Sequence, residues 1–162
     1  MKNPILLSII VTVMLIGAAA IFSNKTYRVE RIISATPEEI WAVLMDTAAY
    51  GEWNPVFVKV EGSYAAGGTV LNTFKDPSGK LFDVTNKVEA LEPNRLLRQK
   101  GGFTGVLTFD HQWLLEQAEG GTKVIQYEID RGIYVWFWDD SWIVPKYTEV
   151  LQALEREVAR RK

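Results

Sequence analysis

One side chain in this sequence changes charge near neutral pH, because the 162 residues include a single histidine, His111. It lies in the alternating run Phe109-x-His111-x-Trp113-x-Leu115, whose other members are apolar. In a strand, this alternation points His111 toward the interior. There it could transfer a proton or contact a ligand, or it could be a core histidine satisfied by one hydrogen bond.

The segment from Lys123 to Asp130 carries the other polar groups that could take part in chemistry. One face of a strand here would hold Ile125, Tyr127 and Ile129, and the other would hold Val124, Gln126, Glu128 and Asp130. Ordinary burial favours the isoleucine face inside. The opposite register, one residue away, would bring Glu128 beside His111.

A carboxylate next to an imidazole in an apolar pocket could do general acid/base work, or it could simply orient the polar head of a ligand. Other catalytic constellations do not occur. The sequence has no G-x-S-x-G, P-loop, G-x-G-x-x-G or H-E-x-x-H motif and no cysteine. We therefore expect no metal site and no cofactor, and we do not expect an enzyme with a conventional active site.

The composition predicts one globular domain with an appendage, since 48% of the residues are apolar and 12% are aromatic. The formal net charge is −2. Basic residues cluster only at the C-terminus, where they favour the negative pole of a helix: Arg156, Arg160, Arg161 and Lys162. Nucleic acid is therefore not an expected partner. The sequence gives no indication of the oligomeric state.

The N-terminus carries 19 uncharged residues from Pro4 to Phe22. As a helix they would extend roughly 28 Å, close to the thickness of a bilayer's hydrocarbon core. We expect residues 1–24 to form a single transmembrane anchor and residues 25–162 to form the ligand-binding domain. The alternative is a signal peptide, with Ala18-Ala19-Ala20 as its cleavage site.

The charges that flank this segment favour a domain on the outer, periplasmic or extracellular, side of the membrane. Lys2 and the amino terminus favour an inside N-terminus, although Lys25, Arg28 and Arg31 favour the opposite orientation. The sequence therefore predicts a single-pass membrane protein, with the membrane as a partner through the N-terminal helix.

A helix is predicted from Pro37, because Thr36 is a good N-cap and Glu39 completes a capping box. Turn residues separate seven expected strands, and no βαβ spacing occurs between them, which favours an antiparallel sheet. The strands cover residues 26–34, 56–64, 69–75, 81–91, 95–100, 106–117 and 123–131. A final helix is expected from about Ser141 or Lys146 to Arg160, with an inner stripe of Tyr147, Leu151, Leu154 and Val158.

Three stretches resemble the START-like superfamily, which holds Bet v 1-like proteins, polyketide cyclases and lipid carriers of the SRPBCC type. They are Ser34–Pro55 (SATPEEIWAVLMDTAAYGEWNP), Val88–Leu96 (VEALEPNRL) and Gly120-Gly121-Thr122. The resemblance covers about residues 27–160. It implies an α+β helix-grip fold, in which a curved seven-stranded antiparallel sheet wraps a long C-terminal helix around an apolar cavity.

The same resemblance favours the register that sends Val124, Gln126 and Glu128 into the cavity. The side chains then expected to line it are Trp41, Trp53, Asn54, His111, Trp113, Gln126, Glu128 and Leu151. The aromatic residues Trp136, Phe137, Trp138 and Trp142 would either pack on the sheet or form a lid that touches lipid headgroups.

The leading hypothesis is a membrane-anchored binder or carrier of a hydrophobic small molecule, such as a lipid, an isoprenoid quinone or a polyketide-like compound. The alternative is an enzyme of the cyclase or dehydratase type that uses His111 with Glu128 or Asp83. A third hypothesis is an accessory or assembly protein whose interior is filled by its own side chains.

Overall fold

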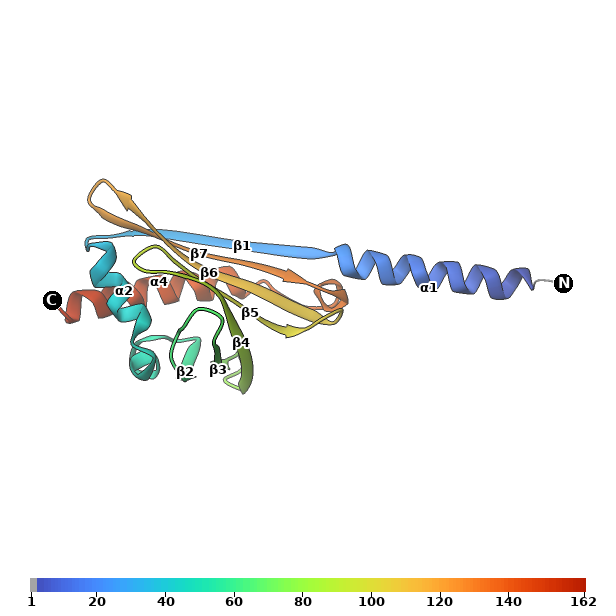
Figure 1. The fold of residues 1–162 in the computed structure, drawn as a ribbon, viewed down its shortest axis with the longest axis horizontal. Coiled ribbons are helices and arrows are strands. Elements are labelled where there is room, and N and C mark those ends of the chain that lie inside the picture. Colours follow the sequence, from blue (N-terminus) through green and yellow to red (C-terminus); the bar gives the residue numbers. More distant parts are fainter. Residues whose placement is uncertain (1–2) are drawn as a thin grey trace.

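A computed structural model describes residues 3–162, apart from the side chains of residues 20 and 21. Its centre is a seven-stranded antiparallel sheet, ordered β1-β7-β6-β5-β4-β3-β2. The strands are β1 (Asn24–Ile33), β2 (Phe57–Glu61), β3 (Thr69–Lys75), β4 (Leu81–Glu92), β5 (Leu96–Phe103), β6 (Leu107–Ala118) and β7 (Gly121–Arg131). The first and last strands of the chain thus pair, and the helix that follows β7 returns along the sheet (Figure 1).

The helices are α1 (Pro4–Phe22), α2 (Pro37–Met45), α3 (Tyr50–Trp53) and α4 (Ile143–Arg160), with short 3-10 turns η1 (Thr47–Ala49) and η2 (Ile133–Trp136). The predicted capping box forms at the start of α2. The Thr36 hydroxyl accepts from the Glu39 amide, and the Glu39 carboxylate accepts from the Thr36 amide at 2.8 Å. This fixes where the chain leaves β1 and begins to cover the sheet.

Helix α4 lies along one face of the sheet, which we call the inner face; the opposite face is the outer face (Figure 1). The predicted inner stripe of α4 is confirmed, because Tyr147, Leu151, Leu154 and Val158 are all buried in the core. Sheet residues of the same core include Val70, Val88, Leu97, Trp113 and Val124. The predicted helix-grip arrangement of sheet and C-terminal helix is therefore confirmed.

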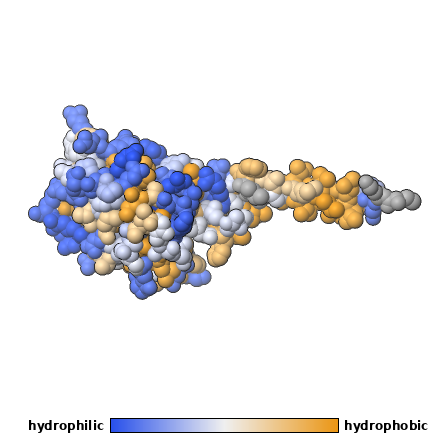
Figure 2. Space-filling model, viewed as in Figure 1, coloured by the Kyte–Doolittle hydropathy of each residue, from blue (hydrophilic) through white to orange (hydrophobic). Residues whose placement is uncertain are grey.

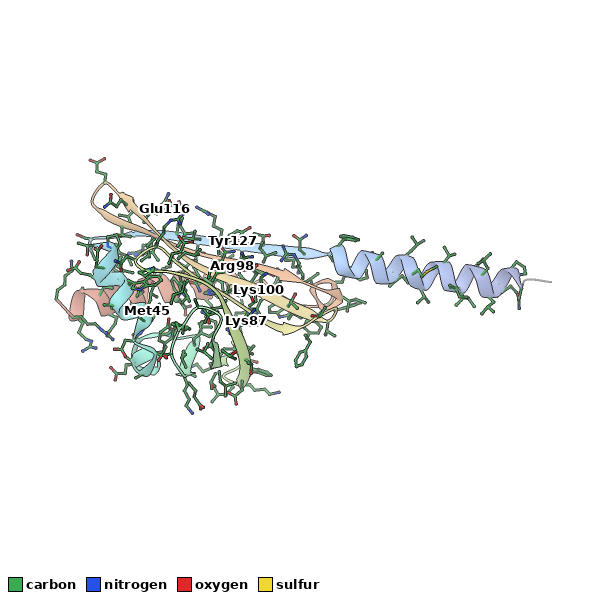
Figure 3. All side chains as sticks on the ribbon, in the orientation of Figure 1. Met45, Lys87, Arg98, Lys100, Glu116 and Tyr127 are labelled. Carbon is green, nitrogen blue, oxygen red and sulfur yellow. The ribbon has the colours of Figure 1, made fainter. Side chains whose placement is uncertain are left out.

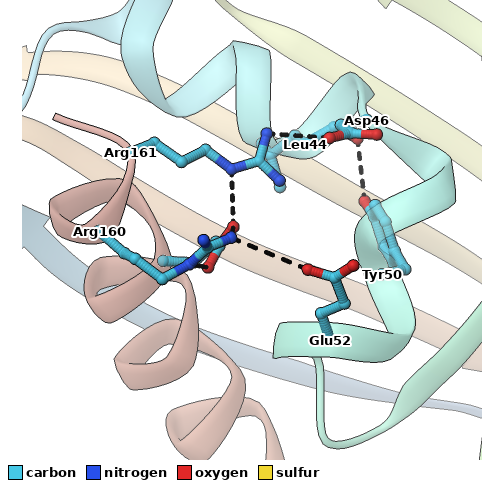
Figure 4. Close-up of polar contacts among 7 residues, drawn as sticks. Leu44, Asp46, Tyr50, Glu52, Arg160 and Arg161 are labelled. Carbon is cyan, nitrogen blue, oxygen red and sulfur yellow. Dashed lines mark hydrogen bonds and ion pairs between the residues drawn. The ribbon is translucent and has the colours of Figure 1, made fainter.

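The C-terminal end of α4 is tied to the α2–α3 region by charged residues (Figure 4). Glu157, only 5% exposed, accepts hydrogen bonds from Arg160 and Arg161, with each of the three nitrogen–oxygen distances at 2.7 Å. Arg161 also contacts Asp46 at 3.0 Å, and Arg160 lies 3.8 Å from Glu52. We call these five residues the C-terminal clamp.

The N-terminal segment forms the helix expected from its sequence, and apolar residues gather along it where it projects from the domain (Figures 1 and 2). The predicted transmembrane anchor is nevertheless wrong: within residues 3–162, the structure contains no helix with both the length and the apolar character that crossing a bilayer requires. The same finding contradicts three related predictions. These are the single-pass membrane location, the domain on the outer side of the membrane, and the membrane as a partner through this helix.

Candidate ligand-binding site

The inner face of the sheet carries a row of buried polar side chains, one or more from each of five neighbouring strands. We call it the interior polar row: Asn72, Asn86, Gln99, His111, Gln126, Glu128 and Asp130. The strand register places all of them on the same face, since Gln99 pairs with His111 and His111 pairs with Glu128. The predicted register of β7 is thus confirmed, with Gln126 and Glu128 inward.

The β3–β5 part of the row is linked by amides. The Gln99 Oε1 atom accepts long hydrogen bonds from Asn72 Nδ2 at 3.5 Å and from Asn86 Nδ2 at 3.4 Å. The Oδ1 atoms of Asn72 and Asn86 are buried and have no hydrogen-bond partner among the described residues. Buried amide oxygens in proteins are normally paired, so these two acceptors remain available to a further donor.

His111 occupies the centre of the row and is neutral. Its Nε2 lies 3.0 Å from Gln126 Nε2. This contact is a hydrogen bond whose donor is set by the tautomer of the ring. Complete burial lowers the pKa of His111 from 6.5 to about 4, against the opposing charge of Asp110. Its ring also packs edge-on against Trp113 and Tyr147, with centroids 5.7 Å apart in each pair.

Glu128 and Asp130 form the acidic end of the row. The Tyr147 hydroxyl of α4 donates to Glu128 Oε2 at 2.8 Å. Burial, and secondly the charge of Asp130, raise the pKa of Glu128 well above its ordinary range. Burial likewise raises the pKa of Asp130. Both Asp130 oxygens lack an amide or hydroxyl donor among the described residues, and their hydrogen-bonding neighbour is the Glu128 carboxyl.

From the sequence, we expected Glu128 to lie beside His111, and the structure partly agrees. The two residues are direct neighbours on paired strands, but the described hydrogen bonds join His111 to Gln126 and Glu128 to Tyr147. Asp83, the alternative partner of His111, is exposed and accepts from Thr73 Oγ1 at 2.7 Å. It belongs to the outer face, so the version of the enzyme hypothesis that pairs it with His111 is wrong.

The other residues expected to line a cavity are buried in the structure. Trp41, Trp53, Trp113 and Leu151 belong to the core cluster. Asn54 has a structural role, because its Oδ1 accepts from the amides of Val56 and Phe57 at 2.9 Å. Whether these side chains contact a ligand stays a prediction.

The two main hollows that the described residues form both lie away from the interior polar row, so neither is the apolar cavity expected between the sheet and α4. One, of about 340 Å³, lies over the outer face near Lys87, Lys100 and Asp110; another, of about 650 Å³, lies near Thr36, Gly121 and Lys162. Figure 3 shows Lys87, Arg98 and Lys100 along the sheet. Their charges are largely paired, since Arg98 binds both carboxylate oxygens of Asp110 and Lys87 binds Glu89. Within the described residues, no cluster of three metal-ligating side chains occurs.

Sequence reasoning missed the roles of Tyr147 and Asp130. Tyr147 was expected on the inner stripe of α4, but its hydroxyl group was not expected to bind Glu128. Asp130 continues the period-two pattern of Gln126 and Glu128, and that pattern was the available signal for its burial.

The sequence model of the polyketide cyclase/dehydrase and lipid transport family matches residues 25–159. No curated protein matches the sequence. Among solved structures, protein CV1439 from Chromobacterium violaceum is 22% identical, with a TM-score of 0.67, over 82% of this chain and 96% of that one. The crystal structure of Ara h 8.0201 is 17% identical, with a TM-score of 0.64, over 85% of this chain and 99% of that one.

The di-domain ARO/CYC StfQ from the steffimycin biosynthetic pathway has a TM-score of 0.69 at 8% identity, and the match covers 85% of this chain and 52% of StfQ. At these identities the structures show a shared fold. The family match spans nearly the whole domain, and it agrees with the resemblance seen in the sequence. The chain belongs to the polyketide cyclase/dehydrase and lipid transport family.

Proposed function

We propose that the protein binds or carries a hydrophobic small molecule with a polar head group in the interior between the sheet and α4. The supporting observation is the interior polar row, in which acceptor atoms of Asn72, Asn86, Gln126 and Asp130 are buried without an amide or hydroxyl donor among the described residues. Such atoms lower the stability of a fold by about 1–3 kcal/mol each. A ligand that donates hydrogen bonds to them would offset this cost.

The surroundings of the row suit an apolar ligand body. Trp113, Val88, Leu97 and Leu151 are buried on the inner face or on α4, so a ligand in the interior would exchange water for aliphatic and aromatic contacts. Lipids, isoprenoid quinones and polyketide-like compounds all combine such a body with a few oxygen-containing groups.

A cyclase or dehydratase is a second candidate, and the state of Glu128 favours it. The raised pKa of Glu128 favours its protonated form, which can protonate a substrate carbonyl as a general acid. Tyr147 would hold Glu128 in position through its hydrogen bond. In the proposed carrier, the same groups only orient the polar head.

Native mass spectrometry of the full chain tests ligand binding. We expect the purified protein to carry an adduct that organic extraction removes. Gln126→Leu should reduce the adduct because Gln126 faces the interior, whereas Tyr127→Phe on the outer face should leave it unchanged. A spectrum without adduct, together with no change in melting temperature on adding 1-naphthalenemethanol, would contradict the proposal and favour an accessory protein with a filled interior.

A further inference from the structure

We propose that Glu128 and Asp130 bind the protonated nitrogen of an apolar amine, so that the natural ligand has a basic head group. The inference rests on the proposed function and specifies its ligand class. It starts from Asp130, which is 1% exposed and whose two carboxyl oxygens both lack an amide or hydroxyl donor among the described residues. A buried carboxyl whose only hydrogen-bonding neighbour is another carboxyl, here Glu128, is unusual, because burial without neutralising donors is costly.

Asp130 does not stand alone on its face. Glu128 lies two residues earlier in β7 and therefore on the same side of the sheet, and it is 6% exposed. Its one described hydrogen bond comes from the Tyr147 hydroxyl. A protonated amine carries up to three N–H donors, which matches two carboxyl groups with free lone pairs.

No cationic side chain among the described residues forms an ion pair with Glu128 or Asp130. His111 on β6 is neutral, and Tyr147 on α4 and Tyr27 on β1 are hydroxyl groups that already donate, to Glu128 and to Asp140 respectively. Lys25 lies opposite Asp130 on β1 and its charge lowers the pKa of Asp130, but its ammonium group is bound to Asp140 at 2.7 Å and to the Trp138 carbonyl at 3.3 Å. Among the residues of the described chain, no lysine or arginine is buried.

Without a ligand, the two carboxyls lower their mutual repulsion by sharing one proton, which agrees with the raised pKa of each. Binding of an ammonium group would replace that proton. The pair would change from one negative charge to two, the ligand would bring one positive charge, and one proton would leave to the solvent. Charge is therefore conserved within the site, and proton release accompanies binding.

Isothermal titration of the full chain with two matched probes tests the inference. The probes 1-naphthylmethylamine and 1-naphthalenemethanol share their apolar body and differ in an ammonium or a hydroxyl group. We expect the amine to bind about tenfold or more tightly, since charge-assisted hydrogen bonds are roughly twice as strong as neutral ones. Titrations in phosphate and in Tris, whose ionisation enthalpies differ, should show release of up to one proton per amine and none for the alcohol.

Asp130→Asn keeps the shape of the side chain and should abolish both the preference for the amine and the proton release. Asp83→Asn is the matched control, because Asp83 is an exposed carboxylate on the outer face. Equal affinities, or tighter binding of the alcohol, in the wild-type protein would overturn the inference and leave the proposed function intact. If neither probe binds, the proposed function itself fails.

Discussion

Tyr147 of α4 donates its hydroxyl hydrogen to Glu128 of β7 across a distance of 2.8 Å, and this bond joins the C-terminal helix to the acidic end of the interior polar row. Both residues are buried, so water cannot replace either partner easily. The bond thus links the packing of the helix to the chemistry of the site.

Replacing Tyr147 with Phe should remove this donor and keep most of the packing. We expect the free energy of unfolding to fall by about 1–2 kcal/mol, the usual cost of leaving a buried acceptor unpaired. Urea denaturation at neutral pH measures it. Tyr134→Phe is the control, because Tyr134 is exposed and its change should have almost no effect. Equal stabilities of Tyr147→Phe and the wild type would show that the bond is not formed.

The carboxyl pair should make the protein less stable as pH rises. The pKa values of Glu128 and Asp130 are raised in the folded state, so the folded protein binds more protons than the unfolded chain above the ordinary carboxyl range. The contribution of these two carboxyls to folding stability is complete below the ordinary carboxyl pKa range. It is lost as the pH rises through their raised pKa values. Asp130→Asn should flatten the decline in chemical denaturation between pH 5 and 9, and an unchanged slope would argue against a buried pair.

His111 should make the protein less stable as the pH falls, which is the opposite of the effect of the carboxyl pair. Its pKa falls from 6.5 to about 4 on folding, so its contribution is present above 6.5 and is lost as pH falls toward 4. The difference corresponds to a loss of about 3 kcal/mol across that interval. His111→Phe should remove this acid-side loss, although the unpaired Gln126 amide will lower stability at every pH. Histidine NMR titration of the wild type provides the independent check: a midpoint near 6.5 would contradict burial of the ring.

The C-terminal clamp predicts a second acid-sensitive contact. Hydrogen bonds from Arg160 and Arg161 lower the pKa of Glu157 to about 2 against the effect of burial. The contribution of Glu157 to folding stability is present above the ordinary carboxyl pKa and is lost as the pH falls toward 2. Glu157→Gln should lower stability by about 2 kcal/mol at neutral pH, since hydrogen bonds to charged groups are lost. Glu149→Gln, which changes only an exposed pair with Lys146, should have little effect.

Local chemistry explains which features the sequence predicts well. The capping box at Thr36 and Glu39 needs only neighbouring residues, and the inner stripe of α4 follows from helical periodicity. The register of β7 was ambiguous from burial alone, because Ile125 on the outer face is also buried. The family resemblance resolved it correctly.

Contacts between elements that are distant in the sequence were harder to predict. The bond from Tyr147 to Glu128 depends on the rotation of α4 over the sheet, which no local pattern fixes. The start of α4 at Ile143 lies between the two expected positions, Ser141 and Lys146. The N-cap residue is Trp142, which makes no side-chain cap, while Asp139 accepts from the Ser141 amide in the turn before the helix. The N-terminal segment was identified correctly as a helix but wrongly as a membrane span.

The most direct test of ligand binding in the interior is NMR titration of the full chain with 1-naphthalenemethanol, observed at side-chain signals. Saturable shifts are expected for the Gln126 amide, the Asn72 and Asn86 amides and the His111 ring, all of which face the interior. The NMR signal of the Gln112 side-chain amide should not shift, because this group lies on the outer face beside Asp110. Unchanged interior signals at saturating probe, or shifts confined to Gln112 and the outer face, would contradict binding between the sheet and α4.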